Sequence, residues 1–503
     1  MSTPYRTLAA TLSLLASTAL AEPPSPLAPL VAHVSSHRDG KAPASIDFPA
    51  LDGDRSGLPI GVFDSGIGGL TVLEAILSLD AFNNTTLQPG PDGVPDFAGE
   101  RFIYLGDQAN MPYGNYPQKG KEPYLRELIV KDAIFLLGRR QHRSGAVTFD
   151  KPPVKAIVIA CNTATAFGID DIRAALRSWG LDVPVIGVVE AGARAVSQSL
   201  PGGGKGGAVA VLATVGTCDS GAYPRAIGRA GGLAGKSIPP FIQQGSIGLA
   251  GALEGAPAFI SVGKTAHNPA QSARNPAYLG PATANADAPI DPTLLPAYGF
   301  EMSGILGDPA RADTWQLNST ANYARYDITT LVEKYRRSSG TGKGTSPPPI
   351  TTVVLGCTHF PIAQREITAA FTHLRGYRAP DGTQPYLPFI GEHIEYVNPA
   401  EFTARELFRD LARNRLRATR DGRQPPEIAH SYISVPNPDS REARLNPDGT
   451  LDTAYKYSRD PGRMDLEDTI PIPMSEAPTV LKSLSGLSHA LPKVWTQLTR
   501  LSP

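Results

Sequence analysis

Six short apolar runs occur between residues 58 and 356 of the chain, separated by stretches with helical patterning and by glycine-rich turns. They are Ile60–Phe63, Arg101–Leu105, Ala156–Ile159, Val183–Val188, Ala208–Leu212 and Thr352–Leu355. Continuous apolar runs of this length are typical of strands that are buried on both faces of a parallel sheet, and the helices between them supply the crossovers. The pattern predicts an α/β fold with mainly parallel sheets and helices on both faces.

The chain contains a weak internal repeat. The segment Val158–Thr163 resembles Val354–His359, because each has a strand, a small residue, a cysteine at the strand's carboxyl end and then polar residues. Ile60–Ser65 and Val209–Thr214 correspond as the opening strands of the two halves. Ligands of such sheets bind beyond the carboxyl ends of the strands. Two facing halves would therefore place one cysteine each at a shared cleft.

The remaining segments suggest the following organisation. We expect a signal peptide at 1–21, a linker at 22–57, a first α/β domain at 58–190 completed by 390–435, a second α/β domain at 191–389, and a C-terminal extension at 436–503. The second domain carries an insertion at 255–315, rich in Ala, Pro, Asn and Gly, and the extension has a helix around Ala477–Leu491. Loops as long as 255–315 and 436–473 are either functional lids or disordered, and the sequence leaves both open.

The N-terminus has the features of a secretory signal peptide. Arg6 supplies a positive charge, Leu8–Leu20 is largely apolar, and Ala19-Leu20-Ala21 is a small-x-small cleavage site. We therefore expect an exported, periplasmic protein with no membrane span after cleavage.

Composition excludes several classes of function. Lys+Arg and Asp+Glu each number 47, a balance that argues against a nucleic-acid partner. The three cysteines are too few for a disulfide scaffold. The nine histidines occur without an HExxH motif or a CxxC pair, so we expect no metal, and no lysine context suggests a bound aldehyde cofactor.

Cys161 and Cys357 are the strongest candidates for chemistry. Each follows a predicted strand and precedes residues whose amides could open a helix, a place where a thiolate is favoured. Two thiols on opposite sides of a carbon acid suit one reaction: one removes the proton and the other returns it on the far face, which inverts the stereocentre. Cys218 has no partner in the repeat, and we expect it to be structural.

Three further segments have both a chemical and a structural interpretation. Asp64 opens the glycine-rich loop Asp64–Gly69, where it could accept a proton, orient an ammonium group or cap a helix. His359, two residues after Cys357, could stabilise a thiolate by its charge or be structural. Tyr113-Gly114 lies on a loop suited to closing over a ligand.

At these segments the chain resembles the aspartate/glutamate racemase family. The resemblance rests on six motifs in order, VFDSGIGGLTVLEAI, YLGDQANMPYG, IACNTATA, PVIGVVEAGARAV, LATVGTCDSGAY and VVLGCTHFPI. It implies two pseudo-symmetric α/β domains with the active site between them, no cofactor, and interconversion of L- and D-glutamate or aspartate. It assigns proton transfer to Cys161 and Cys357, assisted by Asp64 and His359. It assigns substrate binding to Asp64, Ser65, Tyr113, Gly114, Asn162, Thr163, Thr358 and His359.

The resemblance also implies a glutamate near the second cysteine, after the helix that contains Tyr223. The matching stretch is SIPPFIQQGS, which has Gln243 or Gln244 where a carboxylate is expected. That departure motivates one alternative to the racemase, an exported amino-acid-binding protein without turnover. A second alternative, a racemase of another carbon acid such as a hydantoin, stays open because Asn162-Thr163 and Thr358-His359 bind by hydrogen bonds that do not fix the length of the substrate side chain. The family's habits and the C-terminal helix also favour a homodimer.

Overall fold

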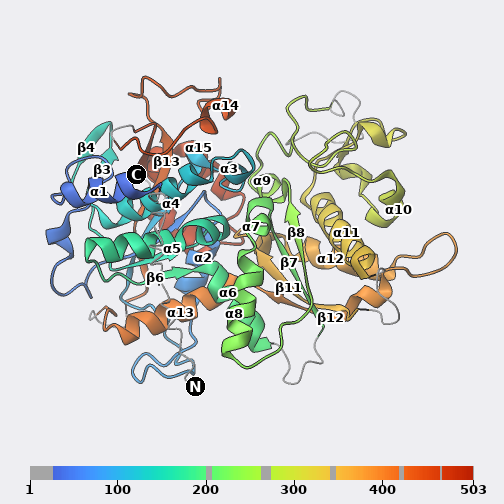
Figure 1. Ribbon diagram of the computed structural model, residues 1–503, viewed down its shortest axis with the longest axis horizontal. Coiled ribbons are helices and arrows are strands. Elements are labelled where there is room, and N and C mark those ends of the chain that lie inside the picture. Colours follow the sequence, from blue (N-terminus) through green and yellow to red (C-terminus); the bar gives the residue numbers. More distant parts are fainter. Residues whose placement is uncertain are drawn as a thin grey trace, which may run out of the picture.

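The computed structural model describes residues 26–199, 207–261, 274–339, 347–418, 424–464 and 467–501. The expected signal peptide at 1–21 lies outside these residues. The described chain forms two α/β halves side by side (Figure 1). Within the described residues, no helix is both long and apolar enough to cross a membrane.

The first half is built on a six-stranded sheet with the order β14-β13-β2-β1-β5-β6. Its strands are parallel except for β14, which pairs antiparallel with β13. They are β1 (Ile60–Asp64), β2 (Arg101–Gly106), β5 (Ala156–Ile159), β6 (Val185–Gly187), β13 (Glu427–Pro436) and β14 (Thr469–Pro473). The apolar runs at these positions are buried, as expected for strands covered on both faces.

The second half is built on a four-stranded parallel sheet with the order β12-β11-β7-β8. Its strands are β7 (Ala208–Thr214), β8 (Phe241–Ser246), β11 (Ile350–Gly356) and β12 (Ile390–Val397). Taken in chain order, β7, β8, β11 and β12 occupy the same sheet positions as β1, β2, β5 and β6 of the first half. The repeat expected from the sequence is therefore present as a repeated topology.

Helices cover both faces of each sheet (Figure 1). One face of the first sheet packs on α1 (Ala28–Ser36), α4 (Glu122–Leu137) and α5 (Asn162–Trp179), and the other on α2 (Leu70–Ser78), α13 (Pro399–Arg413) and α16 (Pro492–Leu501). The second sheet packs on α11 (Thr320–Ser339) and α12 (Gln364–Gly376) on one face, and on α6 (Val188–Ser199) and α8 (Ala222–Leu233) on the other. The α/β fold class predicted from the apolar runs is confirmed.

Short elements complete the chain. They are α3 (Asn115–Gln118), α7 (Val215–Asp219), α9 (Leu249–Leu253), α10 (Leu295–Tyr298), α14 (Thr453–Lys456), α15 (Pro478–Ser485), and two small hairpins made by β3 (Gln141–Arg143) with β4 (Ala146–Thr148) and β9 (Ile305–Leu306) with β10 (Gln316–Leu317). The described part of the 255–315 insertion packs on α11, with Ile290, Tyr298 and Ile305 buried.

Four details of the expected organisation differ from the structure. Part of the expected linker forms α1, whose Leu30 and Val34 are fully buried against the first half. β12, expected to complete the first domain, pairs with β11 of the second half. The C-terminal extension belongs to the core of the first half, because β14 joins its sheet and α16 packs on α2. The helix expected around Ala477–Leu491 is shorter, since α15 ends at Ser485, and a separate helix, α16, begins at Pro492, where a proline readily opens a helix.

Candidate active site

Cys161 lies at the carboxyl end of β5 and caps α5. Its Sγ accepts a hydrogen bond from the backbone N–H of Ala164 at 3.4 Å, and the Ser65 hydroxyl lies 3.6 Å from it. The residue is 6% exposed. Burial, reinforced by the nearby Asp64 carboxylate, raises the pKa of the Cys161 thiol. In the resting protein this sulfur is therefore a protonated thiol.

Asp64 lies beside the start of α2 and is hydrogen-bonded to both halves of the protein. Its Oδ2 accepts a hydrogen bond from the N–H of Gly69 at 2.5 Å, at the start of α2, and another from the Thr358 hydroxyl at 3.4 Å. Burial raises the pKa of Asp64, partly opposed by the positive charge of His359 and by hydrogen bonds from Ser65, Cys161 and Gly69. The carboxyl therefore lies between Cys161 of its own half and the segment that carries Cys357.

Cys357 follows β11 at the position equivalent to Cys161. Its Sγ lies 3.7 Å from Nδ1 of His359, and Nε2 of His359 lies 2.7 Å from the Glu254 carboxylate. Burial disfavours a charged imidazole, but Glu254 and the Cys357 sulfur outweigh it and raise the pKa of His359 well above its usual value. The result is a buried line of sulfur, imidazolium and carboxylate.

Glu254 corrects the expectation that a glutamine replaces the family's glutamate. Gln243 and Gln244 lie on β8, where their side-chain amides donate to the backbone carbonyls of Cys218 and Gly245. The carboxylate comes instead from Glu254, which directly follows α9. Glu254 directly precedes the insertion at 255–315, and nothing beside it in the sequence indicates that its side chain reaches His359.

The glycine-rich loop of the first half packs against the Cys357 segment. The Thr71 hydroxyl donates to the carbonyl of Thr358 at 2.9 Å. A methyl group on Gly68 would lie 2.2 Å from Cε1 of His359, so only glycine fits there. Together with the Asp64–Thr358 hydrogen bond, these contacts bring the two cysteine-bearing segments to one interdomain site.

A second set of contacts closes the site from the α5 side. Tyr223 donates from its hydroxyl to Oδ1 of Asn162 at 2.6 Å. The Thr163 hydroxyl lies 3.2 Å from that of Thr214 and 3.1 Å from that of Thr217. The motif LATVGTCDSGAY contains Thr214, Thr217 and Tyr223, but the sequence predicted no role for these three residues. They bind the polar groups at the start of α5.

The loop that carries Tyr113 and Gly114 also meets the second half. A methyl group on Gly216 would lie 2.7 Å from the carbonyl oxygen of Gly114, which shows how closely the two backbones approach. Tyr113 is buried, and its hydroxyl lies 2.5 Å from Asp107 and 2.7 Å from Asp132. That hydroxyl is therefore already engaged by two carboxyl groups and is not available to a substrate in this arrangement.

All three cysteines are free thiols. Cys218 lies in α7, half-buried, and burial raises its pKa to about 12. Among the described residues, no group of three or more His, Cys, Asp or Glu side chains is placed to hold a metal ion.

Comparisons with known proteins agree with this geometry. Residues 143–251, which include Cys161 and the start of the second half, match the family model described as Asp/Glu/Hydantoin racemase. This part of the chain is similar to the Asp/Glu/hydantoin racemases. Glutamate racemase of Oceanobacillus iheyensis is 34% identical over 186 residues, covering 36% of this chain and 52% of that protein. Glutamate racemase of Thermus thermophilus is 38% identical over 187 residues, covering 37% and 55%.

The chain thus matches about half the length of these curated relatives. A solved structure of a glutamate racemase isoform from Bacillus anthracis aligns over 74% of this chain and 86% of that chain, with 22% sequence identity and a TM-score of 0.40.

Proposed function

We propose that the protein is a cofactor-independent amino-acid racemase that acts on glutamate or aspartate through a two-cysteine proton transfer. The proposal rests on how the two halves meet. In each half a cysteine follows a strand of the sheet, and Asp64 connects the Cys161 side of the site to the Cys357 segment. The racemase domain match and the curated glutamate racemases support the same reaction class.

The proposed reaction needs one thiol and one thiolate. His359, kept charged by Glu254, would offset the negative charge of a Cys357 thiolate during the reaction, whereas burial favours the thiol of Cys161. In one direction, the Cys357 thiolate takes the α-proton as the Cα–H bond breaks, and the Cys161 thiol delivers its own proton to the opposite face. In the other direction the roles exchange, so each turnover swaps which sulfur carries the proton.

The substrate carboxylate would lie at the start of α5, against the hydroxyl groups of Thr163 and Thr358. In the closed protein, Tyr223, Thr214 and Thr217 occupy the polar groups at the start of α5. Substrate entry therefore requires the halves to separate enough to replace these contacts. The same donors would offset the charge that develops on the carbanion.

The experiment is a chiral assay of glutamate and aspartate with purified protein and three matched variants, Cys161→Ala, Cys357→Ala and Cys218→Ala. We expect the first two to lose racemisation and the third to retain it. Loss in Cys218→Ala alone, or turnover in either of the first two variants, would refute the assignment.

The alternative of a binding protein without turnover was motivated by the absent glutamate, and Glu254 supplies that carboxylate. A hydantoin substrate stays a second candidate, since the matched family model includes hydantoin racemases by its description. Hydantoins in the same chiral assay separate the two substrate classes.

The proposal also includes export through the N-terminal signal peptide and assembly as a homodimer. Fractionation of cells, followed by titration of free thiols in the exported protein, tests the first. Light scattering of the purified protein tests the second.

A further inference from the structure

A cavity of about 370 Å³ lies in the first half, away from the cysteine residues. Its wall combines the 42–45 segment, the end of β2, the α4 helix and the C-terminal extension between Glu442 and Pro471. Cavities that bind small molecules begin at roughly this size. The extension, which the proposed racemase chemistry does not use, therefore closes a second space in the protein.

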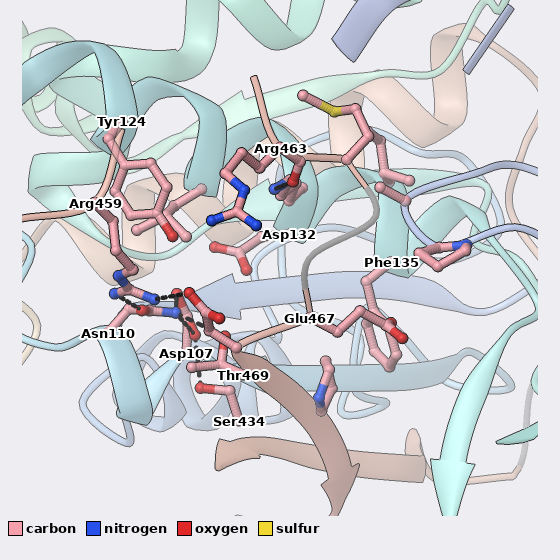
Figure 2. A pocket seen from close by; sticks show the side chains of 18 of the residues that line it. Asp107, Asn110, Tyr124, Asp132, Phe135, Ser434, Arg459, Arg463, Glu467 and Thr469 are labelled. Atoms are coloured by element: carbon pink, nitrogen blue, oxygen red, sulfur yellow. Dashed lines mark hydrogen bonds and ion pairs between the residues drawn. The ribbon is translucent and has the colours of Figure 1, made fainter. Parts of the chain in front are cut away.

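The cavity wall carries charge of both signs (Figure 2). Arg459 from the extension and Asp132 from α4 are both buried, and Figure 2 shows their charged ends and that of Arg463 around the same space. Arg140 and Arg463 are held by bidentate pairs with Glu467 and Glu442, so their charges are already matched. Arg459 and Asp132 have less complete sets of partners for their polar atoms.

Arg459 has an incomplete set of acceptors. Its Nη2 donates to Oδ1 of Asn110 at 2.5 Å and to the Tyr116 hydroxyl at 3.2 Å, and its Nε donates to the carbonyl of Lys456. Its Nη1 has no hydrogen-bond acceptor among the described residues and lies 3.7 Å from the Asp468 carboxylate. A buried guanidinium nitrogen without an acceptor costs free energy that a ligand oxygen would recover after a small shift of the side chain.

Asp132 is placed to receive a cation. The Tyr113 hydroxyl has one proton and lies within hydrogen-bond distance of both Asp107 and Asp132, so one of these carboxyls must carry a proton to complete the pair. Burial and the charge of Asp107 raise the pKa of Asp132 well above its usual value, which identifies Asp132 as that carboxyl. An ammonium group in the cavity would favour the ionised form of Asp132, so we expect ligand binding to release this proton to solvent.

Apolar side chains line the space between these charged groups. They are Leu105, Leu128, Ile134, Phe135 and Met464. We propose that this cavity is a binding site for a zwitterionic amino acid with an apolar side chain, its ammonium group on Asp132, its carboxylate on Arg459 and its side chain between Leu128, Phe135 and Met464. This site is distinct from the proposed racemase site and does not depend on that function.

The wall of the cavity is connected to the second half of the protein through one loop. Asp107 and Asn110 belong to the cavity wall, and the same loop reaches the second half through Gly114. The extension also donates directly to this loop, from Nζ of Lys456 to the carbonyl of Met111 at 2.7 Å.

Titration calorimetry of the full-length protein tests the proposal with three probes: L-phenylalanine, N-acetyl-L-phenylalanine and L-phenylalaninamide. We expect saturable binding of L-phenylalanine, and binding at least tenfold weaker for both single-charge analogues. Excess D-glutamate should leave the binding unchanged. No saturation with L-phenylalanine, equal binding of either analogue, or competition by D-glutamate would overturn the proposal.

Variants locate the binding. Asp132→Asn should weaken the binding of L-phenylalanine at least tenfold. The control is Asp150→Asn, which changes an exposed carboxylate of the same half and should leave the binding unchanged. Because Asp132 also holds Tyr113, Met464→Trp serves as a second test that fills the cavity and leaves both charged groups in place. With circular dichroism showing both variants folded, unchanged binding in Met464→Trp would overturn the site.

Discussion

Replacing Glu254 by glutamine tests whether a carboxylate keeps His359 charged beside Cys357. The substitution preserves the size of the side chain and a hydrogen bond to Nε2 of His359 but removes the negative charge. Both side chains are almost fully buried, at 6% and 7% exposure, so solvent screens their interaction little. We expect the fold to survive and the charge state of the imidazole to change.

The size of the effect follows from the geometry. Two unit charges about 4 Å apart interact by about 4 kcal/mol at an effective dielectric constant of about 20. Since glutamine retains a hydrogen bond, we take a loss of about 3 kcal/mol, which lowers the pKa of His359. Burial, which already disfavours the imidazolium, then has less to oppose it, so the neutral imidazole is favoured more than in the parent protein.

The assay is the pH profile of kcat/KM for glutamate racemisation. At about pH 8 we expect Glu254→Gln to lose about a hundredfold, because about 2.7 kcal/mol corresponds to two powers of ten. The deficit should shrink as the pH falls, since acid restores the imidazolium. Glu301→Gln, at the exposed partner of Arg325, is the control and should match the parent protein.

The stability of the protein provides an independent measurement. A histidine whose pKa is raised by folding stabilises the protein fully below its unfolded pKa of about 6.5, and this contribution is lost as the pH rises through the folded pKa. In Glu254→Gln, the free energy of unfolding measured with urea should therefore change less with pH over this range than in the parent protein. A parent-like rate and an unchanged profile in both assays would refute the role given to Glu254.

Three further substitutions have defined outcomes. Tyr223→Phe removes the donor to Asn162 and should lower the free energy of unfolding by about 1–3 kcal/mol, measured with urea; an unchanged midpoint would show that this hydrogen bond contributes nothing. Gly68→Ala should abolish racemisation in a folded protein because the new methyl meets His359, whereas Gly57→Ala, with open space around it, should be silent; equal activity of the two would contradict the close packing. Burial raises the pKa of Asp327 to about 8, so its protonated form is favoured in the folded protein and stability should fall as the pH rises from about 4 to about 8, by up to about 1.4 kcal/mol per unit. Asp327→Asn should remove that slope in urea unfolding, and a slope that persists would place its origin elsewhere.

Much of the fold was predictable because buried parallel strands leave a local mark. Runs such as Ala156–Ile159 and Ala208–Leu212 are apolar without alternation, and each is a strand of the structure. The repeated cysteine context also predicted the equivalence of β5 and β11, since it depends on residues adjacent in sequence.

The parts that were missed depend on contacts between distant segments. Glu254 lies 105 positions from His359, and nothing near it in sequence shows that the two side chains meet. The burial of Leu30 and Val34 depends in the same way on a surface supplied by the first half, which the proline-rich composition around them conceals. The cavity under the extension joins segments more than 300 residues apart, such as Asn110 with Arg459.

The central claim is that two sulfur atoms act on opposite faces of one stereocentre, and racemisation of L-glutamate in D2O tests it most directly. Early in the reaction, before products return, mass spectrometry separates the deuterium content of each enantiomer. The account predicts D-glutamate that carries one deuterium at Cα, while the remaining L-glutamate keeps its protium. D-glutamate that retains the original protium, or deuterium that enters L-glutamate without inversion, would contradict it.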